Sequence, residues 1–217
     1  MRIFIGYDST QAIAYDVLKF SITSHCPQAK IFPLRLSEIR TVFNFSREHD
    51  PLQSTEFTYT RFLIPYICDY KGLALFMDSD MLCLSNIGEL FSLDMTNYAL
   101  RVVKHVHNPT TLVKMTGKVQ TVYPRKNWSS LMLMDCSKLT SWTKESVELN
   151  KPKWLHRFES IPDEQIGDIP QEWNELDTYG PDTKMIHYTE GGPWLPNYHN
   201  HQYGDVWFKY AKEYLYG

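Results

Sequence analysis

The sequence of 217 residues predicts an α/β fold in which helices flank a mostly parallel sheet, with an irregular segment towards the C-terminus. Three observations predict this fold. The chain opens with a strand–helix–strand pattern, an unbroken apolar run follows at residues 72–77, and half of the twelve prolines fall within residues 151–200. This length suits a single domain spanning residues 1–217.

The opening pattern covers residues 2–34. Residues 2–6 form an apolar run that predicts a buried strand, ended by Gly6-Tyr7-Asp8. Ser9 or Thr10 can cap a following helix, whose apolar positions recur at helical spacing up to residue 22. Residues 30–34 predict a second strand, so the pattern is typical of the start of a parallel, doubly wound sheet.

The middle of the chain predicts a polar loop over residues 41–55 and then a helix over Glu56–Cys68, which Pro65 would kink or interrupt. The apolar run at residues 72–77 is typical of a central parallel strand. Residues 151–200 are expected to wrap the sheet as mostly irregular chain without a core of their own. The remaining elements are a short helix at residues 87–93 capped by Asn86, strands at residues 98–103 and 131–134, a functional loop or flap at residues 104–118 containing His105, His107, Pro109 and Gly117, and an aromatic helix at about residues 203–216.

The composition excludes several classes of protein. A net charge of −3 argues against a general nucleic-acid binder. The apolar runs are too short for a transmembrane segment, and residues 1–6 do not resemble a signal peptide. Aromatic residues make up 14% of the chain and either stack on sugars or fill a half-buried core. The four cysteines lack zinc-site spacing, so a soluble, reduced, cytoplasmic protein is expected: Cys26, Cys68, Cys83 and Cys136.

Asp78 and Asp80 follow the apolar run at residues 72–77 directly. Ligands of a parallel sheet bind beyond the carboxyl ends of its strands, and carboxylates two residues apart in extended chain point to the same side. Such oxygen ligands suit Mg²⁺ or Mn²⁺, which also bind diphosphates. The alternative is a solvated turn, because Asp-Ser-Asp is also typical of turns.

Other families that place aspartates after an apolar strand fit less well. A P-loop ATPase needs GxxxxGK[ST], whereas Thr116-Gly117-Lys118-Val119 lacks the first glycine and the final hydroxyl residue. A phosphatase of the haloacid dehalogenase type has Thr or Val where this chain has Leu82, and its motif lies on the first strand. A response-regulator receiver has a different arrangement of acidic residues and a shorter domain.

Five segments, in order, carry a likeness to one known family: residues 3–8, 55–62, 76–80, 124–130 and 187–194. On these segments, which span nearly the whole chain, the sequence resembles the GT-A (Rossmann-like) glycosyltransferases near family 8. It also resembles the glycosyltransferases that large algal viruses encode for their capsid glycans. The resemblance implies transfer of a sugar from a UDP-sugar to a hydroxyl group of a carbohydrate or glycoconjugate, with retention of configuration.

The resemblance also implies a role for each matching residue. Asp78, Asp80 and His187 would hold Mn²⁺ or Mg²⁺. Asp163 would hold sugar hydroxyls, and Glu164 or Gln165 would approach the anomeric carbon. The donor would be bound by Gly6, Tyr7 and Asp8 around the uridine, by Arg61, Asp78 and Ser79 near the sugar nucleotide, and by Lys126, Gly191 and Gly192 near the phosphates.

One residue departs from the family pattern. Many family 8 enzymes have a lysine just before the final Pro-Trp, where it meets the diphosphate, and Gly192 occupies that place here. Backbone N–H groups of Gly191 and Gly192, or the charge of Arg125 or Lys126, could serve the phosphates instead. His105 and His107 could line the acceptor side, and Trp194 is expected to pack.

Two other functions stay open at this point. One is a metal-dependent phosphatase or nucleotide-sugar hydrolase that uses Asp78 as its nucleophile. The other is a non-catalytic carbohydrate-binding module, suggested by the tyrosine and tryptophan content. Neither alternative requires nucleic acid or a membrane as a partner.

Overall fold

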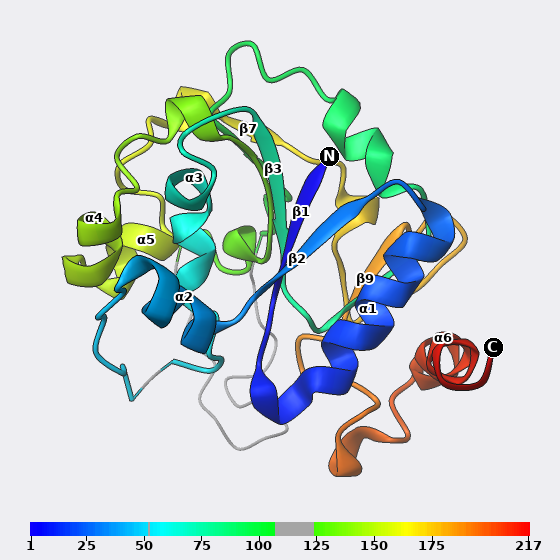
Figure 1. The fold of residues 1–217 in the computed structure, drawn as a ribbon. Coiled ribbons are helices and arrows are strands. Elements are labelled where there is room, and N and C mark those ends of the chain that lie inside the picture. The colour runs from blue at the N-terminus through cyan, green and yellow to red at the C-terminus, as the bar shows by residue number, and fades with distance from the viewer. Residues whose placement is uncertain (52, 107–123) are drawn as a thin grey trace.

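The computed structural model describes residues 1–51, 53–106 and 124–217. A six-stranded sheet in the order β2-β1-β3-β6-β5-β7 lies at the centre (Figure 1). Strand β1 pairs in parallel with β2 and β3, and β5 with β7, whereas β6 runs antiparallel to both of its neighbours. The predicted α/β class with a largely parallel sheet is therefore confirmed. The strands are β1 (Arg2–Gly6), β2 (Lys30–Leu34), β3 (Leu73–Met77), β5 (Leu100–Val102), β6 (Leu131–Asp135) and β7 (Ile166–Asp168).

A smaller sheet of three strands lies beside the first, in the order β4-β9-β8. It is formed by β4 (Met81–Cys83), β8 (Glu175–Leu176) and β9 (Met185–His187). The pairing of β4 with β9 is antiparallel and places Met81 opposite His187. Residues 78–80 connect β3 of the large sheet to β4 of the small one, so they lie where the two sheets meet.

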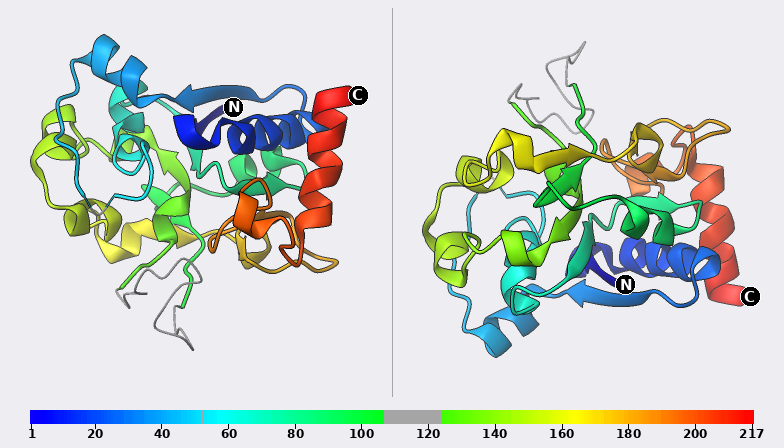
Figure 2. Two further views of the ribbon diagram at one scale, coloured as in Figure 1. Left: turned by 90° about the horizontal axis from the view of Figure 1, so that it is seen from below. Right: turned by 90° about the horizontal axis from the view of Figure 1, so that it is seen from above.

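Helices cover both faces of the large sheet (Figures 1 and 2). Along β1, Ile3 and Ile5 join the apolar cluster beneath α1, whereas Phe4 joins the cluster on the opposite face. Burial of both faces explains why β1, β3 and β6 are continuous apolar runs. Helices α1 (Ala12–His25) and α6 (Gly204–Tyr216) pack together on one side, and α2 (Leu36–Phe43), α3 (Ile64–Ile67), α4 (Lys144–Leu149) and α5 (Pro152–His156) lie on the other.

The start of α1 was predicted in the right place, but with the wrong cap. A 3₁₀ turn, η1 (Ser9–Gln11), comes first, and the Asp8 carboxylate accepts a hydrogen bond of 3.0 Å from the Thr10 N–H. Asp8 is therefore the N-cap of η1, since its side chain satisfies an amide that the first turn leaves without a partner. Helix α1 itself follows from Ala12 and has no side-chain cap.

The helix predicted over Glu56–Cys68, with a kink or break at Pro65, forms only in part. The chain forms turns, then the 3₁₀ helix η2 (Thr60–Leu63), and then the single-turn helix α3. Pro65 lies in the first turn of α3, where its missing N–H costs no intrahelical hydrogen bond. The predicted short helix capped by Asn86 is a 3₁₀ helix, η3 (Ile87–Ser92), and Asn86 does accept from the Gly88 N–H. Helices α2 and α4 were not predicted.

The segment at residues 151–200 contributes more to the fold than its prolines suggested. It supplies α5, β7 at one edge of the large sheet, and β8 and β9 of the small one. Trp173 and Tyr188 are buried in apolar clusters that they share with other parts of the chain, so this segment adds residues to the common core. Strands of two or three residues are too short to show an alternating pattern. The predicted C-terminal helix is confirmed as α6.

The four cysteines are buried and free. In the described ranges, every helix is too short or too polar to cross a lipid bilayer. His107, Pro109 and Gly117 of the predicted flap lie outside the described residues.

Candidate functional site

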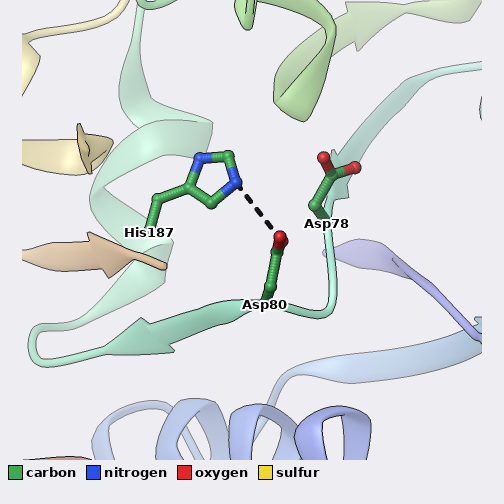
Figure 3. Close-up of side chains that lie close together, drawn as sticks. All are labelled: Asp78, Asp80 and His187. Carbon is green, nitrogen blue, oxygen red and sulfur yellow. Dashed lines mark ion pairs between the residues drawn. The ribbon is translucent and has the colours of Figure 1, made fainter. Parts of the chain in front are cut away.

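Asp78, Asp80 and His187 converge where the two sheets meet (Figure 3). The aspartates come from the β3–β4 connection, and His187 ends β9. One ligand atom from each residue lies within 4.8 Å of the others. His187 Nε2 lies 3.2 Å from Asp80 Oδ1. Strand pairing explains the meeting, because the Tyr188 N–H donates to the Asp80 carbonyl and so fixes β9 beside the connection.

The donor set fits a divalent cation. Oδ1 of Asp78 and Oδ1 of Asp80 are both buried, and although each lies in an ion pair, neither accepts a well-directed hydrogen bond from any described residue. A bound cation would give both oxygens a further partner, as buried acceptors normally have well-directed ones. Two carboxylate oxygens and one imidazole nitrogen are a donor set that Mn²⁺ accepts and that Mg²⁺ accepts less readily. Asp78, Asp80 and His187 could therefore hold such an ion.

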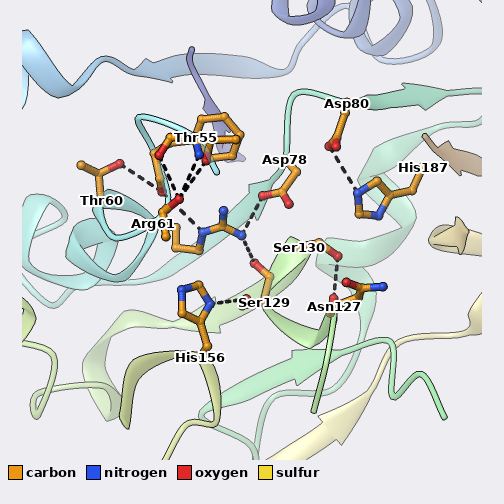
Figure 4. Close-up of polar contacts among 12 residues, drawn as sticks. Thr55, Thr60, Arg61, Asp78, Asp80, Asn127, Ser129, Ser130, His156 and His187 are labelled. Carbon is orange, nitrogen blue, oxygen red and sulfur yellow. Dashed lines mark hydrogen bonds and ion pairs between the residues drawn. The ribbon is translucent and has the colours of Figure 1, made fainter. Parts of the chain in front are cut away.

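Arg61 supports Asp78 from the opposite side (Figure 4). Its Nη1 lies 2.7 Å from Asp78 Oδ1 and donates to the Ser129 carbonyl at 2.8 Å. The guanidinium also lies over the rings of Phe57 and Phe76, at 5.3 and 4.8 Å from their centroids. Arg61 is only 5% exposed, so this cation is held in place by packing as well as by charge.

Charge and burial set the protonation of the cluster. Burial raises the pKa of Asp78 to about 7, although the charge of Arg61 opposes that rise. Burial would also raise the pKa of Asp80, but the neighbouring His187 imidazole holds it below its ordinary value. Burial is the largest single effect on the pKa of His187 and lowers it, but Asp80, Asp78 and Asp177 together outweigh burial, so the pKa of His187 is raised.

Two residues behind His187 were missed in the sequence. His187 Nδ1 lies 2.9 Å from Asn174 Oδ1, and Asn174 Nδ2 donates to Ser130 Oγ at 2.9 Å. Asn174 is completely buried. One buried asparagine in a stretch without periodicity gives no signal in a single sequence, so sequence reasoning had no means of finding it.

The predicted uridine loop lies at the end of β1. Asp8 is buried, and its carboxylate accepts from Thr10 and from the Glu56 N–H at 3.2 Å, so it ties the loop to residue 56. A Cβ on Gly6 would lie 2.3 Å from the Phe57 ring, which explains the glycine. The Tyr7 ring is covered on one face by the Arg35 guanidinium at 4.6 Å.

The glycines after β9 have a packing reason. A Cβ on Gly192 would lie 1.9 Å from the Trp194 ring, and one on Gly191 would lie 2.7 Å from Tyr198. Trp194 packs against Trp207 and donates from Nε1 to Gln11 at 2.9 Å, in line with its expected packing role. The Trp194 ring thus occupies the space that a lysine side chain at position 192 would need.

Among the described residues, no hydrogen bond or ion pair joins the predicted catalytic segment, Asp163–Gln165, to Asp78, Asp80 or His187. Asp163 forms an ion pair with Arg125, and its side chain is 85% exposed. Glu164 is exposed and Gln165 half-buried, whereas Lys126 and Ser79 are buried. Arg125 is used in this pair and also lies over the Trp128 ring at 5.5 Å.

Two neutral histidines lie near the cluster. Burial and the charge of His187 lower the pKa of His105 to about 4, and His105 Nε2 is buried without a partner among the described residues. Burial and the charges of Arg61 and Arg47 lower the pKa of His156 to about 3, and its Nδ1 contacts Ser129 Oγ at 2.9 Å. Sequence reasoning gave His156 no role.

Comparison with solved structures shows the fold. The chain is similar to the glycosyltransferase GlyE of Streptococcus pneumoniae TIGR4, with a TM-score of 0.63 and 15% identity over 97% of this chain but only 59% of GlyE. It is similar to the galactosyltransferase LgtC in complex with donor and acceptor sugar analogs, with a TM-score of 0.62 and 12% identity over 98% of this chain and 96% of LgtC. The expected viral likeness is found at a TM-score of 0.55, in a glycosyltransferase involved in glycosylation of the major capsid of PBCV-1, with 13% identity over 94% of this chain and 98% of that one.

Sequence comparison shows the family. The chain is 41% identical to Protein CDI of Arabidopsis thaliana, over 98% of this chain and 86% of that protein. The family model described as "Glycosyl transferase family 8" matches residues 16–171, which is more than half of the chain. The chain therefore belongs to glycosyl transferase family 8 and is a glycosyltransferase.

Proposed function

We propose that the chain transfers a sugar from a UDP-sugar to a hydroxyl group of a carbohydrate or glycoconjugate, with retention of configuration. We further propose that Asp78, Asp80 and His187 hold Mn²⁺ or Mg²⁺ for this reaction. Membership of family 8 supports the sugar transfer. The resemblance of the chain to GT-A enzymes of this family supports a UDP-sugar as donor and retention of the anomeric configuration.

The observation that carries the proposal is the convergence of Asp78, Asp80 and His187 where the two sheets meet, with one ligand atom of each within 4.8 Å of the others. A bound cation supplies stabilisation of the negative charge that develops on a departing nucleoside diphosphate. Arg61 favours the ionised form of Asp78 and holds its carboxylate in place by an ion pair at 2.7 Å. The loop of Gly6, Tyr7 and Asp8 is proposed to bind the uridine.

The remaining roles follow the family resemblance. Asp163 is proposed to hold hydroxyls of the transferred sugar, and Glu164 to approach its anomeric carbon. Because Trp194 covers position 192, the diphosphate would be met by backbone N–H groups of Gly191 and Gly192 and by Lys126.

A thermal-shift panel tests the proposal. Nucleotide sugars, UDP and GDP are each added with and without MnCl₂, and UDP compounds are expected to raise the melting temperature when Mn²⁺ is present. A panel in which no UDP compound stabilises the protein would contradict the proposed donor. Product formed from the preferred UDP-sugar is then examined by NMR, where an anomeric configuration opposite to that of the donor would contradict retention.

The same preparation tests the two alternative functions. A phosphatase or nucleotide-sugar hydrolase should release phosphate or free sugar from its substrate without any acceptor. A carbohydrate-binding module should bind a sugar equally well with and without Mn²⁺ and nucleotide. The proposed transferase should instead need an acceptor for rapid turnover of the UDP-sugar.

A further inference from the structure

A buried chain of hydrogen bonds runs from His187 through Asn174 to Ser130 at the start of β6. Figure 4 shows its last contact, between Ser130 and Asn127. His187 Nδ1 lies 2.9 Å from Asn174 Oδ1. Asn174 Nδ2 donates to Ser130 Oγ at 2.9 Å, and Ser130 Oγ donates to the Asn127 carbonyl at 2.6 Å. His187, Asn174 and Ser130 are 3%, 0% and 4% exposed, so water does not compete for these contacts.

The order of donors in this chain follows from its last member. The Asn127 carbonyl can only accept, so the Ser130 hydroxyl must use its single hydrogen there. Ser130 Oγ can then only accept, and the group of Asn174 that faces it must be the NH₂. Asn174 therefore turns its oxygen towards His187, and only a protonated Nδ1 can bond to that oxygen.

This order determines which nitrogen of His187 is offered to a ligand. With the hydrogen of the neutral ring on Nδ1, the lone pair is on Nε2, and Nε2 is the atom that lies 3.2 Å from Asp80 Oδ1. A histidine that binds a metal commonly donates its other N–H to a neighbouring acceptor, which fixes both tautomer and ring orientation.

The same short segment also fixes the carboxylate side of the cluster. The Ser130 carbonyl accepts from the Asp78 N–H at 2.9 Å, and the Ser129 carbonyl accepts from Arg61 at 2.8 Å. Asn127 has φ of 64°, a left-handed conformation that asparagine tolerates better than most residues. Residues 127–130 thus hold both the Asp78 backbone and, through Asn174, the His187 ring.

We propose that Asn174 is a positioning residue, held by Ser130, which keeps neutral His187 in the tautomer with hydrogen on Nδ1 so that Nε2 binds the metal. The effect of Asn174 on metal affinity rests on the proposed metal site. The tautomer of His187 can be tested in the metal-free protein and does not depend on that site.

The first experiment is a long-range ¹H–¹⁵N spectrum of the histidine rings in metal-free protein, with His187 assigned by its absence from His187→Asn. Wild type is expected to show Nδ1 protonated and Nε2 unprotonated once the ring is neutral. Asn174→Leu and Ser130→Ala are expected to shift the ring towards a mixture of tautomers, whereas Ser130→Thr keeps the hydroxyl and should retain the wild-type spectrum. A wild-type spectrum for Asn174→Leu, or a proton on Nε2 in wild type, would overturn the inference.

The second experiment is calorimetric titration of the same proteins with MnCl₂. Mn²⁺ affinity is expected to fall by about 10- to 100-fold in Asn174→Leu, by less in Ser130→Ala, and little in Ser130→Thr. Ser21→Ala is a matched control, because Ser21 in α1 is also a fully buried serine with hydrogen bonds at 2.8 and 3.1 Å, and these bonds go to the Leu18 carbonyl and the Cys83 N–H and not to Asn174 or His187. Equal losses in Ser21→Ala and Ser130→Ala would indicate a general packing effect and overturn the positioning role.

The two hypotheses fail in different ways. If wild type binds no Mn²⁺, the proposed metal site fails, while the histidine spectrum still decides the tautomer. If wild type binds Mn²⁺ and Asn174→Leu binds it equally well, only the role of Asn174 fails. Should Asn174→Leu not fold, the comparison of Ser130→Ala with Ser130→Thr decides.

Discussion

The Asp78–Asp80–His187 cluster and the Asp163–Gln165 segment carry similar polar groups, but the fold holds them in opposite ways. His187 is buried, the side chains of Asp78 and Asp80 are only 16% and 35% exposed, and Arg61, Asn174 and strand pairing each fix one of the three. Asp163 is 85% exposed, and its described contact is an ion pair with Arg125. Buried groups with fixed partners are positioned before a ligand arrives, whereas an exposed side chain must be ordered by the ligand itself.

The largest expected effect is a loss of transferase activity when a residue of the Asp78–Asp80–His187 cluster is substituted. Asp80→Asn keeps the shape of the side chain but removes the charge that a divalent cation needs, so transferase activity should fall by at least about 100-fold. Asp182→Asn, at an exposed aspartate outside the site, is the matched control and should keep wild-type activity. Steady-state kinetics with saturating MnCl₂ measure both; activity within tenfold of wild type in Asp80→Asn would count against the metal site.

Stability should distinguish the two ion pairs. Arg61→Met leaves the buried Asp78 carboxylate without its cation, and the free energy of unfolding should fall by about 3 kcal/mol. Asp163→Asn breaks an exposed pair and should cost less than about 1 kcal/mol. Urea unfolding of both variants gives the comparison, and similar losses would show that burial does not separate the two regions.

A comparison of two glycines, Gly192 and Gly180, tests how tightly the chain after His187 is packed. Gly192→Ala places a methyl group 1.9 Å from the Trp194 ring and should lower the free energy of unfolding by about 1–3 kcal/mol. A Cβ at Gly180 would have no atom within 4 Å, so Gly180→Ala should change the free energy of unfolding by less than about 0.5 kcal/mol. Thermal unfolding of the pair is sufficient, and an unaffected Gly192→Ala would mean that Trp194 moves freely.

The exposed segment should affect activity without affecting stability. If Asp163 and Glu164 act on the transferred sugar, Asp163→Asn and Glu164→Gln should each lower kcat by about tenfold or more, because positioning groups of this kind contribute that much. Their melting temperatures should match wild type. Unchanged kcat in both variants would remove this segment from the site.

The smallest effect concerns the neutral His156. Its pKa is about 3 in the fold and about 6.5 in an unfolded chain, so between these values the unfolded state binds more protons and stability falls as the pH is lowered. The expected slope is at most about 1.4 kcal/mol per pH unit for this one residue. Urea unfolding at pH 7.5, 6 and 5 should show a shallower dependence for His156→Gln than for wild type, and an identical dependence would exclude His156 as a source of acid sensitivity.

The parts of the fold that could be predicted are the longer helices and strands whose apolar residues lie on one face or on both faces. The strand before Asp78 is an example, because five consecutive apolar residues bounded by turn residues are typical of a buried strand. The helix predicted over residues 56–68 forms only over residues 60–67, as a 3₁₀ helix and then a single α-turn, in which Pro65 lies in the first turn of α3. Strands β8 and β9 contain two and three residues and carry no readable period.

The site divides in the same way. The aspartates could be found from their position after a strand, whereas His187 was placed by family resemblance alone. Asn174 and Ser130 act through contacts between segments far apart in sequence, which one sequence does not reveal. The packing reason for a glycine at position 192 could not be predicted either, because it depends on the Trp194 ring lying over the chain at that position.

The antiparallel pairing of β4 with β9, with Met81 opposite His187, makes the site depend on strand alignment. Side chains alternate between the two faces of a sheet, so sliding β9 by one residue would turn His187 away and present Ile186 or Tyr188 to the aspartates. A single inserted residue within β9 would thus dismantle the ligand set while every ligand stayed in the sequence. The turn before β9 can vary in length without this penalty, and natural or engineered length changes should therefore be tolerated between residues 178 and 183 and not within 185–187.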